Sequence, residues 1–211
     1  QQMFGAIAKT YYAEKAGIDP AKIVSVSVMP CTAKKAEAAR PEMNASGYRD
    51  VDVVITTREL GRMIREAGLD FKHLPEDSYD SPLGTGTGAA VIFGTTGGVM
   101  EAALRTVADV LTGENLQTVR GMEQTREAEL TIAGNTVKIA VVHTLASARK
   151  ILERIRAGEA DYQFIEVMAC PGGCIGGGGQ PIPVNAEIRR ARREGLFDCD
   201  SANELRKSHE N

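Results

Sequence analysis

The chain has 211 residues, 43% of them hydrophobic and 25% charged, which suits a globular protein with a buried core. Its net charge of −3 indicates neither a nucleic-acid partner nor an anionic membrane surface as partner. No apolar run approaches the roughly 18 residues of a membrane span, so we expect no membrane segment. Four unevenly spaced cysteines do not fit a disulfide framework, and a reducing cytoplasm is the expected compartment.

The first half of the chain alternates helical and strand-like segments. Residues 3–16 are predicted to form an amphipathic helix that Gly17 ends, and its apolar face is expected to carry Met3, Ile7, Tyr11 and Ala16. The segments that follow are, in order, a strand at 23–29, a charged helix-prone stretch at 31–50, a strand at 51–55, a helix capped by Thr57 and ended by Gly68, and a loop at 70–90.

The second half predicts a helix at about 99–112 with its buried face at Val99, Ala103, Val107 and Val110. The later segments are a possible strand at 117–122, a hairpin of 130–132 and 137–142, a helix capped by Ser147, a strand at 164–169, and a basic helix capped by Asn185. This order predicts an α/β fold, with a mostly parallel sheet of about four strands flanked by helices and an added β-hairpin. We expect a single domain over residues 1–211.

Two predicted strands run directly into cysteines. The first ends at Pro30-Cys31, and the second ends at Cys170-Pro171-Gly172-Gly173-Cys174. Strand ends are where an α/β sheet opens its ligand crevice, and soft thiolates beside glycine backbone suit an iron–sulfur cluster. A zinc ribbon would prefer two residues between its cysteines rather than three. The competing interpretation is that these are buried cysteines in a glycine turn.

Two further residues have both a chemical and a plain interpretation. Lys34 follows Cys31 by three residues, so its ammonium group could neutralise an anionic cofactor or simply face solvent. His143 ends a predicted strand and could complete a Cys3His zinc site, although a core histidine is the simpler interpretation.

Three patterns receive less weight. Gly97-Gly98 opens a helix whose N-terminus could face an anionic cofactor or form a simple turn. The glycines of residues 84–88 lack the preceding strand and the spacing of a nucleotide loop. The arginines of residues 189–193 are expected to form a solvated helix face, and a docking surface for an electron partner is the alternative.

The segment Val28–Lys35 resembles the second signature of the iron-only, or [FeFe], hydrogenases. The segment Phe164–Cys174, with Gly177–Pro181, resembles the third signature. The stretches Thr56–Leu60 and Phe93–Arg105 are also similar to the family, so that the resemblance covers essentially the whole chain. It looks closest to the catalytic subunits of clostridial NAD(P)-linked, electron-bifurcating enzymes.

The resemblance implies an H-cluster, in which a [4Fe-4S] cubane joins a two-iron subsite bearing carbon monoxide, cyanide and a bridging dithiolate. It implies that Cys31, Cys170 and Cys174 ligate the cubane, with Cys174 also bridging to the two-iron subsite. Lys34 would hydrogen-bond a cyanide. The remaining pocket residues that the resemblance implies are Gln1, Met29, Pro30, Phe93 and Met168. The reaction would be the reversible conversion of two protons and two electrons to dihydrogen.

The chain also departs from the family pattern. The family's first signature, with a further cubane ligand and the proton-relaying cysteine, is expected upstream of Gln1 together with ferredoxin-like domains. We therefore expect one lobe of a two-lobed catalytic domain that is inactive alone. Cys199 matches no family ligand. The partners that the resemblance implies are the missing lobe and cluster domains, ferredoxin or NAD(P)-linked subunits, and maturation factors.

Two other functions compete with a hydrogenase. The eukaryotic cytosolic iron–sulfur assembly proteins of the nuclear prelamin A recognition type share the lobe and its cysteines without making hydrogen. A sensory hydrogenase homologue would have an altered pocket and low activity. The Cys170–Cys174 loop favours the hydrogenase over the assembly protein.

Overall fold

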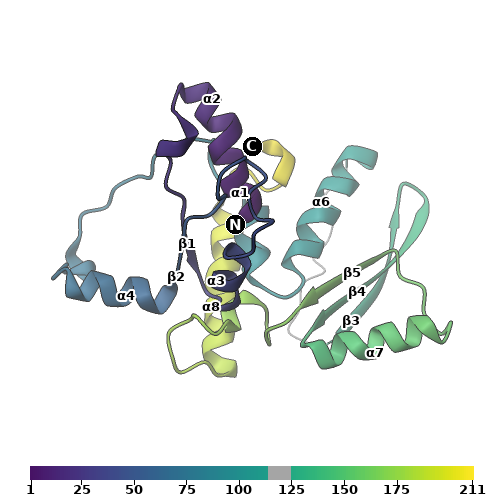
Figure 1. Cartoon of the computed structure of the whole chain (residues 1–211). Helices are drawn as coiled ribbons and strands as arrows, with labels where there is room; N and C mark the ends of the chain where they lie inside the picture. The colour runs from purple at the N-terminus through teal and green to yellow at the C-terminus, as the bar shows by residue number, and fades with distance from the viewer. Residues whose placement is uncertain (114–124) are drawn as a thin grey trace. The chain divides into compact units, whose positions relative to one another are not determined.

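The computed structural model describes residues 1–113 and 125–211, which form two compact units (Figure 1). Unit 1 comprises Gln1–Gly84 and Gly178–Ile182, and unit 2 comprises Thr85–Gly177 and Pro183–Asn211. Each unit is described by itself, and the expected single domain therefore stays a prediction. The expected strand at 117–122 lies outside the described residues. Every helix in the described ranges is too short or too polar to cross a lipid bilayer.

Unit 1 contains a two-stranded parallel sheet. Strand β1 (Val26–Met29) pairs with β2 (Val53–Thr56) in a register that places Met29 beside Thr56. The helices of the unit are α1 (Gln2–Ile7), a π-helical turn (Ala8–Tyr12), α2 (Ala13–Ala16), α3 (Ala33–Ala38) and α4 (Thr57–Glu66), with 3-10 turns at Pro20–Lys22 and Phe71–His73. The first predicted helix is thus confirmed with a π-helical turn inside it, and Gly17 ends it at a φ of 64°.

Helix α4 is capped by Thr56, one residue before the expected cap at Thr57. The Thr56 hydroxyl accepts a hydrogen bond from the Glu59 N–H, and the Glu59 carboxylate accepts one from the Thr56 N–H at 2.7 Å. This reciprocal capping box satisfies two backbone N–H groups that would otherwise lack partners at the helix start. Thr56 is thus both the last residue of β2 and the cap of α4.

The side chains expected on the apolar face of the first helix are instead exposed, with Met3 79% and Tyr11 56% accessible. The buried face contains the small residues Gly5, Ala8 and Ala13, together with Lys9, which pairs with Asp52 at 2.7 Å. A Cβ on Gly5 would lie 2.2 Å from the Asp50 carbonyl oxygen, so the helix approaches this loop too closely for a side chain. The expected face was wrong because close backbone approach, rather than side-chain size, selects what is buried.

Unit 2 contains a mixed three-stranded sheet. Strands β3 (Thr125–Ile132) and β4 (Asn135–His143) form an antiparallel hairpin, and β5 (Phe164–Met168) pairs parallel to β4. Ala133 and Gly134 both have positive φ at the hairpin turn, as a two-residue primed turn requires. The helices are α5 (Gly88–Val91), α6 (Gly98–Thr112), α7 (Leu145–Arg156) and α8 (Ala186–Ala202), with 3-10 turns at Ile92–Gly94, Cys174–Gly176 and Ser208–Glu210.

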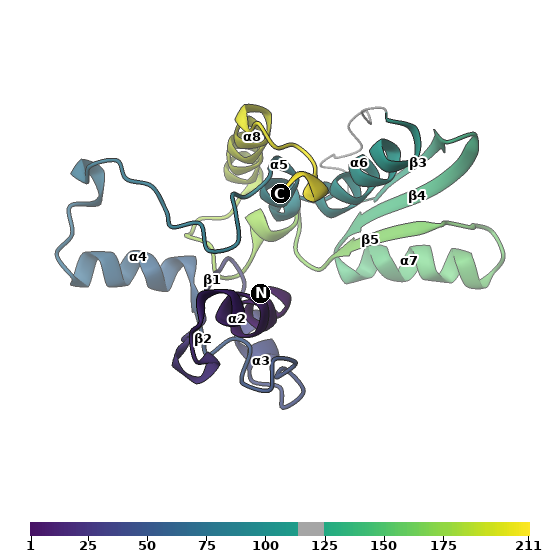
Figure 2. The same ribbon diagram turned by 90° about the horizontal axis from the view of Figure 1, so that it is seen from above.

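Helices α6 and α7 cover opposite faces of this sheet (Figure 2). The cluster on the α6 face contains Met100, Leu104, Ile132, Ile139 and Val141. The cluster on the α7 face contains Ala140, Val142, Ala148 and Ile151. Because the part of β4 at residues 139–142 is buried on both faces, its sequence is continuously apolar rather than alternating. The predicted α/β class, with parallel strand pairs, flanking helices and a hairpin, is confirmed, although the parallel pairs are divided between two sheets.

The expected buried face of α6 was wrong. Val107 and Val110 are exposed, whereas Glu101 and Arg105 are buried. Arg105 donates hydrogen bonds to both carboxylate oxygens of Asp200 at 2.8 Å and to Glu101 at 2.6 Å. The prediction failed because it assumed that the charged residues of this helix face solvent. The buried ion pairs of Arg105 instead place the side of the helix that carries Glu101 and Arg105 in the core.

Asp200, on α8, is fully buried and joins several segments of unit 2. It accepts hydrogen bonds from Arg105 and from the Arg206 guanidinium, and a Cβ on Gly88 would lie 2.3 Å from its Oδ1. Burial alone would raise the pKa of Asp200, but the hydrogen bonds from Arg105 and Arg206 hold this pKa at about 2. The carboxylate is therefore charged whenever the protein is folded near neutral pH.

We predict that Asp200→Asn destabilises the protein by about 3–5 kcal/mol, because it leaves the buried Arg105 charge without its carboxylate. Urea unfolding at pH 7 measures this change. Asp198→Asn on the same helix is the matched control, because Asp198 is exposed and should change stability by no more than about 0.5 kcal/mol. Equal stability of the two variants would contradict the prediction.

The same carboxylate predicts a dependence of stability on pH. The pKa of about 2 in the folded protein lies below the roughly 3.9 of an unfolded aspartate. The stabilisation is therefore complete above about pH 4 and is lost as the pH falls through about 2. The free energy of unfolding is measured as a function of pH. Between about pH 4 and 2 it should fall less steeply in Asp200→Asn than in the unchanged chain, whereas Asp198→Asn should behave like the unchanged chain.

Candidate functional site

Cys31 follows the end of β1 and is half-buried. Gly179, which follows Cys174 by five residues in the chain, packs on this strand end within unit 1. Its N–H donates to the Pro30 carbonyl at 2.9 Å, and a Cβ on Gly179 would lie 2.9 Å from the Cys31 nitrogen. Only glycine fits there, which explains one glycine of the Gly176–Gly179 run. This contact lies wholly within unit 1.

Gln1 and Lys34, both predicted site residues, lie together near this strand end. The Gln1 side-chain amide donates to the Lys34 carbonyl at 3.0 Å, and the Lys34 ammonium forms an ion pair with Glu37. Burial would raise the pKa of Glu37, but the hydrogen bond and charge of Lys34 outweigh it, so the pKa of this carboxyl is lowered. The Gln1 Oε1 is buried without a hydrogen-bond partner in the described part of the chain. Met29 and Pro30, also predicted, are half-buried at the end of β1.

The second cysteine motif follows β5 in unit 2. Met168 ends the strand, and Cys170 and Cys174 are both half-buried in the loop after it. Gly172 and Gly173 adopt φ values of 80° and 90°, which residues with a side chain rarely adopt. A Cβ on Gly173 would lie 2.7 Å from the Thr96 nitrogen. The loop is therefore built from backbone packed directly on backbone.

The turn that follows Phe93 is the surface on which this loop packs. The Thr96 N–H donates to the Gly172 carbonyl at 3.1 Å, and a Cβ on Gly173 would lie 3.0 Å from the Gly94 carbonyl oxygen. Phe93 itself remains 44% exposed in the 3-10 turn before Gly94. The structure thus places this predicted residue in the segment that contacts the cysteine loop.

Glu166 is a site-neighbouring residue that the sequence analysis missed. Its buried carboxylate on β5 accepts hydrogen bonds from the Gly97 N–H at 2.6 Å and the Met100 N–H at 2.7 Å. Burial raises the pKa of Glu166, and these backbone hydrogen bonds partly offset the rise. The N-terminus of α6 therefore binds a side chain of the protein itself. A lone acid within the apolar strand Phe164–Met168 was the pattern that could have revealed it.

The end of β4 lies beside Met168 and carries local backbone strain. The Cα of His143 pairs with that of Met168, and the Nδ1 of His143 lies 3.3 Å from the Thr96 hydroxyl. Burial, and secondarily the charge of Arg189, lowers the pKa of His143. The next residue, Thr144, has a φ of 73°, which is costly for a β-branched residue. Its N–H donates to the Met168 carbonyl at 2.8 Å, and this hydrogen bond helps to hold the strained geometry.

Two arginines of α8 contact the cysteine loop, although this run was expected to be solvated. Arg192 donates to the Ile175 carbonyl at 2.8 Å. A Cβ on either Gly172 or Gly176 would lie 3.2 Å from the Arg189 Cδ. The expected solvated face was wrong for these two positions because the glycines of the loop leave room for the arginine side chains. The exposed Arg190 fits the expectation.

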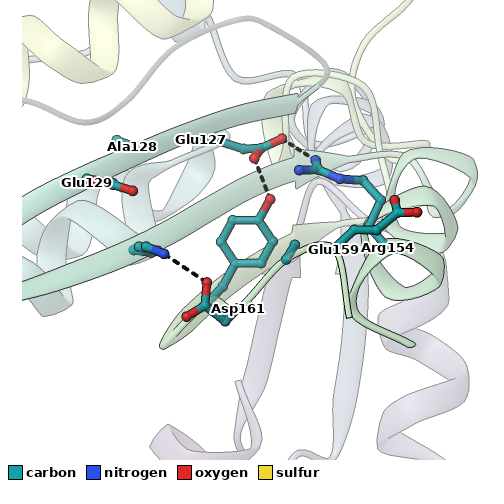
Figure 3. Close-up of a pocket in the computed structure, with 9 residues that line it drawn as sticks. Glu127, Ala128, Glu129, Arg154, Glu159 and Asp161 are labelled. Atoms are coloured by element: carbon teal, nitrogen blue, oxygen red, sulfur yellow. Dashed lines mark hydrogen bonds and ion pairs between the residues drawn. The ribbon is translucent and has the colours of Figure 1, made fainter. Parts of the chain in front are cut away.

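A separate pocket of about 320 Å³ in unit 2 is lined mainly by charged side chains (Figure 3). Glu127 accepts hydrogen bonds from Arg154 at 2.6 Å and from the Tyr162 hydroxyl, and Lys138 pairs with Asp161 at 2.9 Å. These pairs join β3 and β4 to α7 and to the segment that precedes β5. The pocket contains no cysteine, and its charges serve the packing of the sheet edge.

The predicted site residues fall into two groups. Unit 1 contains Gln1, Met29, Pro30, Cys31 and Lys34, and unit 2 contains Phe93, Met168, Cys170 and Cys174. Among the described residues, no three His, Cys, Asp or Glu side chains come together as a metal-binding group. The convergence of the three predicted cysteine ligands therefore stays a prediction. Cys199 is exposed on α8.

Comparison with known proteins shows the family. Residues 1–178 match the family described as the iron only hydrogenase large subunit, C-terminal domain. The whole chain is 53% identical to the NADP-reducing hydrogenase subunit HndD of Solidesulfovibrio fructosivorans and spans 37% of that protein. It also aligns over its whole length with 61% of the [FeFe]-hydrogenase HydA1 from Chlamydomonas reinhardtii, with 40% identity and a TM-score of 0.82.

The competing assembly-factor interpretation is less well supported. The cytosolic Fe-S cluster assembly factor narfl of Xenopus tropicalis is 36% identical over 85% of the chain and 40% of that protein. The chain spans about two fifths of both curated relatives. The long second and third signatures, the fold and the extent of the match agree. The chain therefore belongs to the iron-only hydrogenase large subunit family, within its C-terminal domain.

Proposed function

We propose that this chain forms part of the catalytic centre of an iron-only hydrogenase that interconverts dihydrogen with protons and electrons. The observation that carries the proposal is the shared construction of its two cysteine motifs. Each places a half-buried cysteine directly after a strand, and glycine backbone packs at contact distance beside it. Glycine backbone next to a cysteine suits thiolate ligation of an iron–sulfur cluster, because backbone N–H groups can donate to cluster and thiolate sulfurs.

The donor set fits the cofactor that the family uses. We propose that Cys31, Cys170 and Cys174 ligate a [4Fe-4S] cubane and that Cys174 also bridges to a two-iron subsite. When bound, that subsite would supply the reversible combination of two protons and two electrons into dihydrogen. Gly179, from the third signature, packs on the strand end before Cys31.

The remaining predicted residues would act as the wall of this site. We propose that Lys34 donates a hydrogen bond to an anionic ligand of the two-iron subsite, which requires its ammonium to turn away from Glu37. Gln1 carries a buried Oε1 without a partner in the described chain, so it has an acceptor available for a bound group. Met29, Pro30, Phe93 and Met168 would exclude water around the subsite.

The exposed apolar surface of unit 1 supports a role for further protein segments. A groove of about 580 Å³ runs along β1, and it is lined by residues 23–29 together with Gln1, Phe4, Ala8, Tyr12, Pro82 and Leu83. Val24, Val26 and Val28 are 68%, 53% and 44% exposed. Since apolar patches of this kind mark interaction surfaces, we propose that the remaining hydrogenase lobe covers them. Ferredoxin-like domains, NAD(P)-linked subunits and maturation factors are the further proposed partners, in the cytoplasm.

We predict that Cys31→Ala, Cys170→Ala and Cys174→Ala each reduce the iron and labile sulfide bound after anaerobic reconstitution, because each removes one cubane ligand. Cys199→Ala is the matched control and should bind as much of both as the unchanged chain. The assay is colorimetric iron and sulfide analysis with the absorption of the cluster. Full iron content in Cys31→Ala would contradict the assignment of a common cluster to the two motifs.

We also predict that the 211-residue chain, matured with its assembly factors, evolves no hydrogen from a reduced dye. Three cysteines leave one iron of a cubane without a protein thiolate, and the exposed groove of unit 1 leaves one wall of the site open. Gas chromatography of the headspace measures the product. Hydrogen above the level of a Cys174→Ala control would show that the chain needs no further lobe.

A further inference from the structure

Arg189 of α8 places an unpaired positive charge against the loop that contains Cys170 and Cys174. A Cβ on Gly172 would lie 3.2 Å from the Arg189 Cδ and 3.8 Å from its Nε. A Cβ on Gly176 would also lie 3.2 Å from the same Cδ. The side chain therefore crosses the loop at two of its glycines, where any other residue would push it away.

The other arginines close to this part of unit 2 have partners. Arg105 and Arg206 share the carboxylate of Asp200, and Arg192 donates to the Ile175 carbonyl. In the described part of the chain, Arg189 forms no ion pair with a carboxylate. A guanidinium without a carboxylate partner beside this loop can compensate the charge of an anion that the loop holds.

The charge of Arg189 affects His143, which ends β4 close to the cysteine loop. The pKa of His143 is lowered by its burial and by the charge of Arg189. His143 ends β4 next to Met168, and its ring approaches Thr96, whose N–H binds the loop at Gly172. A charge that acts on His143 through this packing also acts on any group held by the loop.

A four-iron cluster with thiolate ligands carries net negative charge, which increases when the cluster accepts an electron. Cluster potentials depend on net charge, hydrogen bonding and solvent exposure. A nearby cation stabilises the more negative state, and the effect is largest where water is excluded.

We propose that Arg189 is the charge-compensating residue of the cluster held by Cys170 and Cys174, and that it raises the reduction potential of this cluster. The inference rests on the proposed function. Arg192 differs in role, because its hydrogen bond to Ile175 fixes the loop geometry.

The test compares three variants of the anaerobically reconstituted full chain in a redox titration followed by electron paramagnetic resonance. Arg189→Gln removes the charge and should lower the reduced-to-oxidised ratio at a fixed potential roughly tenfold, which is about 59 mV for one electron. Arg189→Lys keeps the charge and should restore most of the ratio. Arg190→Gln, on the adjacent exposed position, is the matched control and should leave it unchanged.

Equal potentials for Arg189→Gln and Arg190→Gln would overturn the inference. Absence of any cluster signal in the unchanged chain would instead refute the proposed function, and the inference with it. If only Arg189→Gln fails to hold a cluster, nuclear magnetic resonance titration of His143 in the cluster-free chain decides. A raised pKa of His143 in that variant supports the field of Arg189, and an unchanged pKa overturns it.

Discussion

Contact between glycine backbone and neighbouring backbone, at both cysteine motifs, is the constraint on which the candidate site depends. Gly173 packs on the Thr96 nitrogen, and Gly179 packs on the Cys31 nitrogen, each closer than a side chain would allow. These approaches hold each cysteine in a fixed position relative to a strand end. A substitution at either glycine would displace the backbone next to a cysteine without changing a sulfur.

Buried charge is the second organising element, and it is concentrated in unit 2. Glu166 binds the N-terminus of α6, and Arg105 of the same helix binds Asp200 of α8. The helix is thereby fixed at its start and along its length by two carboxylates. Since the turn before α6 contains Thr96, this fixation also sets the surface on which the cysteine loop packs. The buried charges of unit 2 therefore also affect where its cysteine loop lies.

The sequence predicted the elements better than it predicted what each element buries. The hairpin at Ala133-Gly134 and the helix end at Gly17 were predictable because local backbone chemistry determines them. The cysteine ligands stay a prediction, which rests on two long motifs. The buried face of α6 was not, since it depends on Arg105 finding Asp200, a residue 95 positions away. The buried face of the first helix was mispredicted for a related reason. The backbone of Asp50 lies so close to the helix that only glycine fits at position 5.

The residues that position the site were the hardest to predict. Glu166 and Arg189 both look like solvent-facing charges in a linear pattern, and only the fold shows that one is buried and the other crosses a glycine loop. Their roles arise from contacts between segments distant in sequence, for which residue type alone carries little information. A motif identifies which atoms bind a cofactor, whereas the fold is needed to identify which charges surround it.

The valine-lined strand of unit 1 has a practical consequence. Among the described residues β1 pairs with β2 alone, so each strand has one edge without a neighbouring strand. An unpaired edge next to exposed Val24 and Val26 is a template for strand addition by any other chain. During synthesis, such a surface favours self-association until a complementary segment covers it. Purification of the isolated chain at low concentration, rather than at the highest attainable yield, should therefore preserve the monomer.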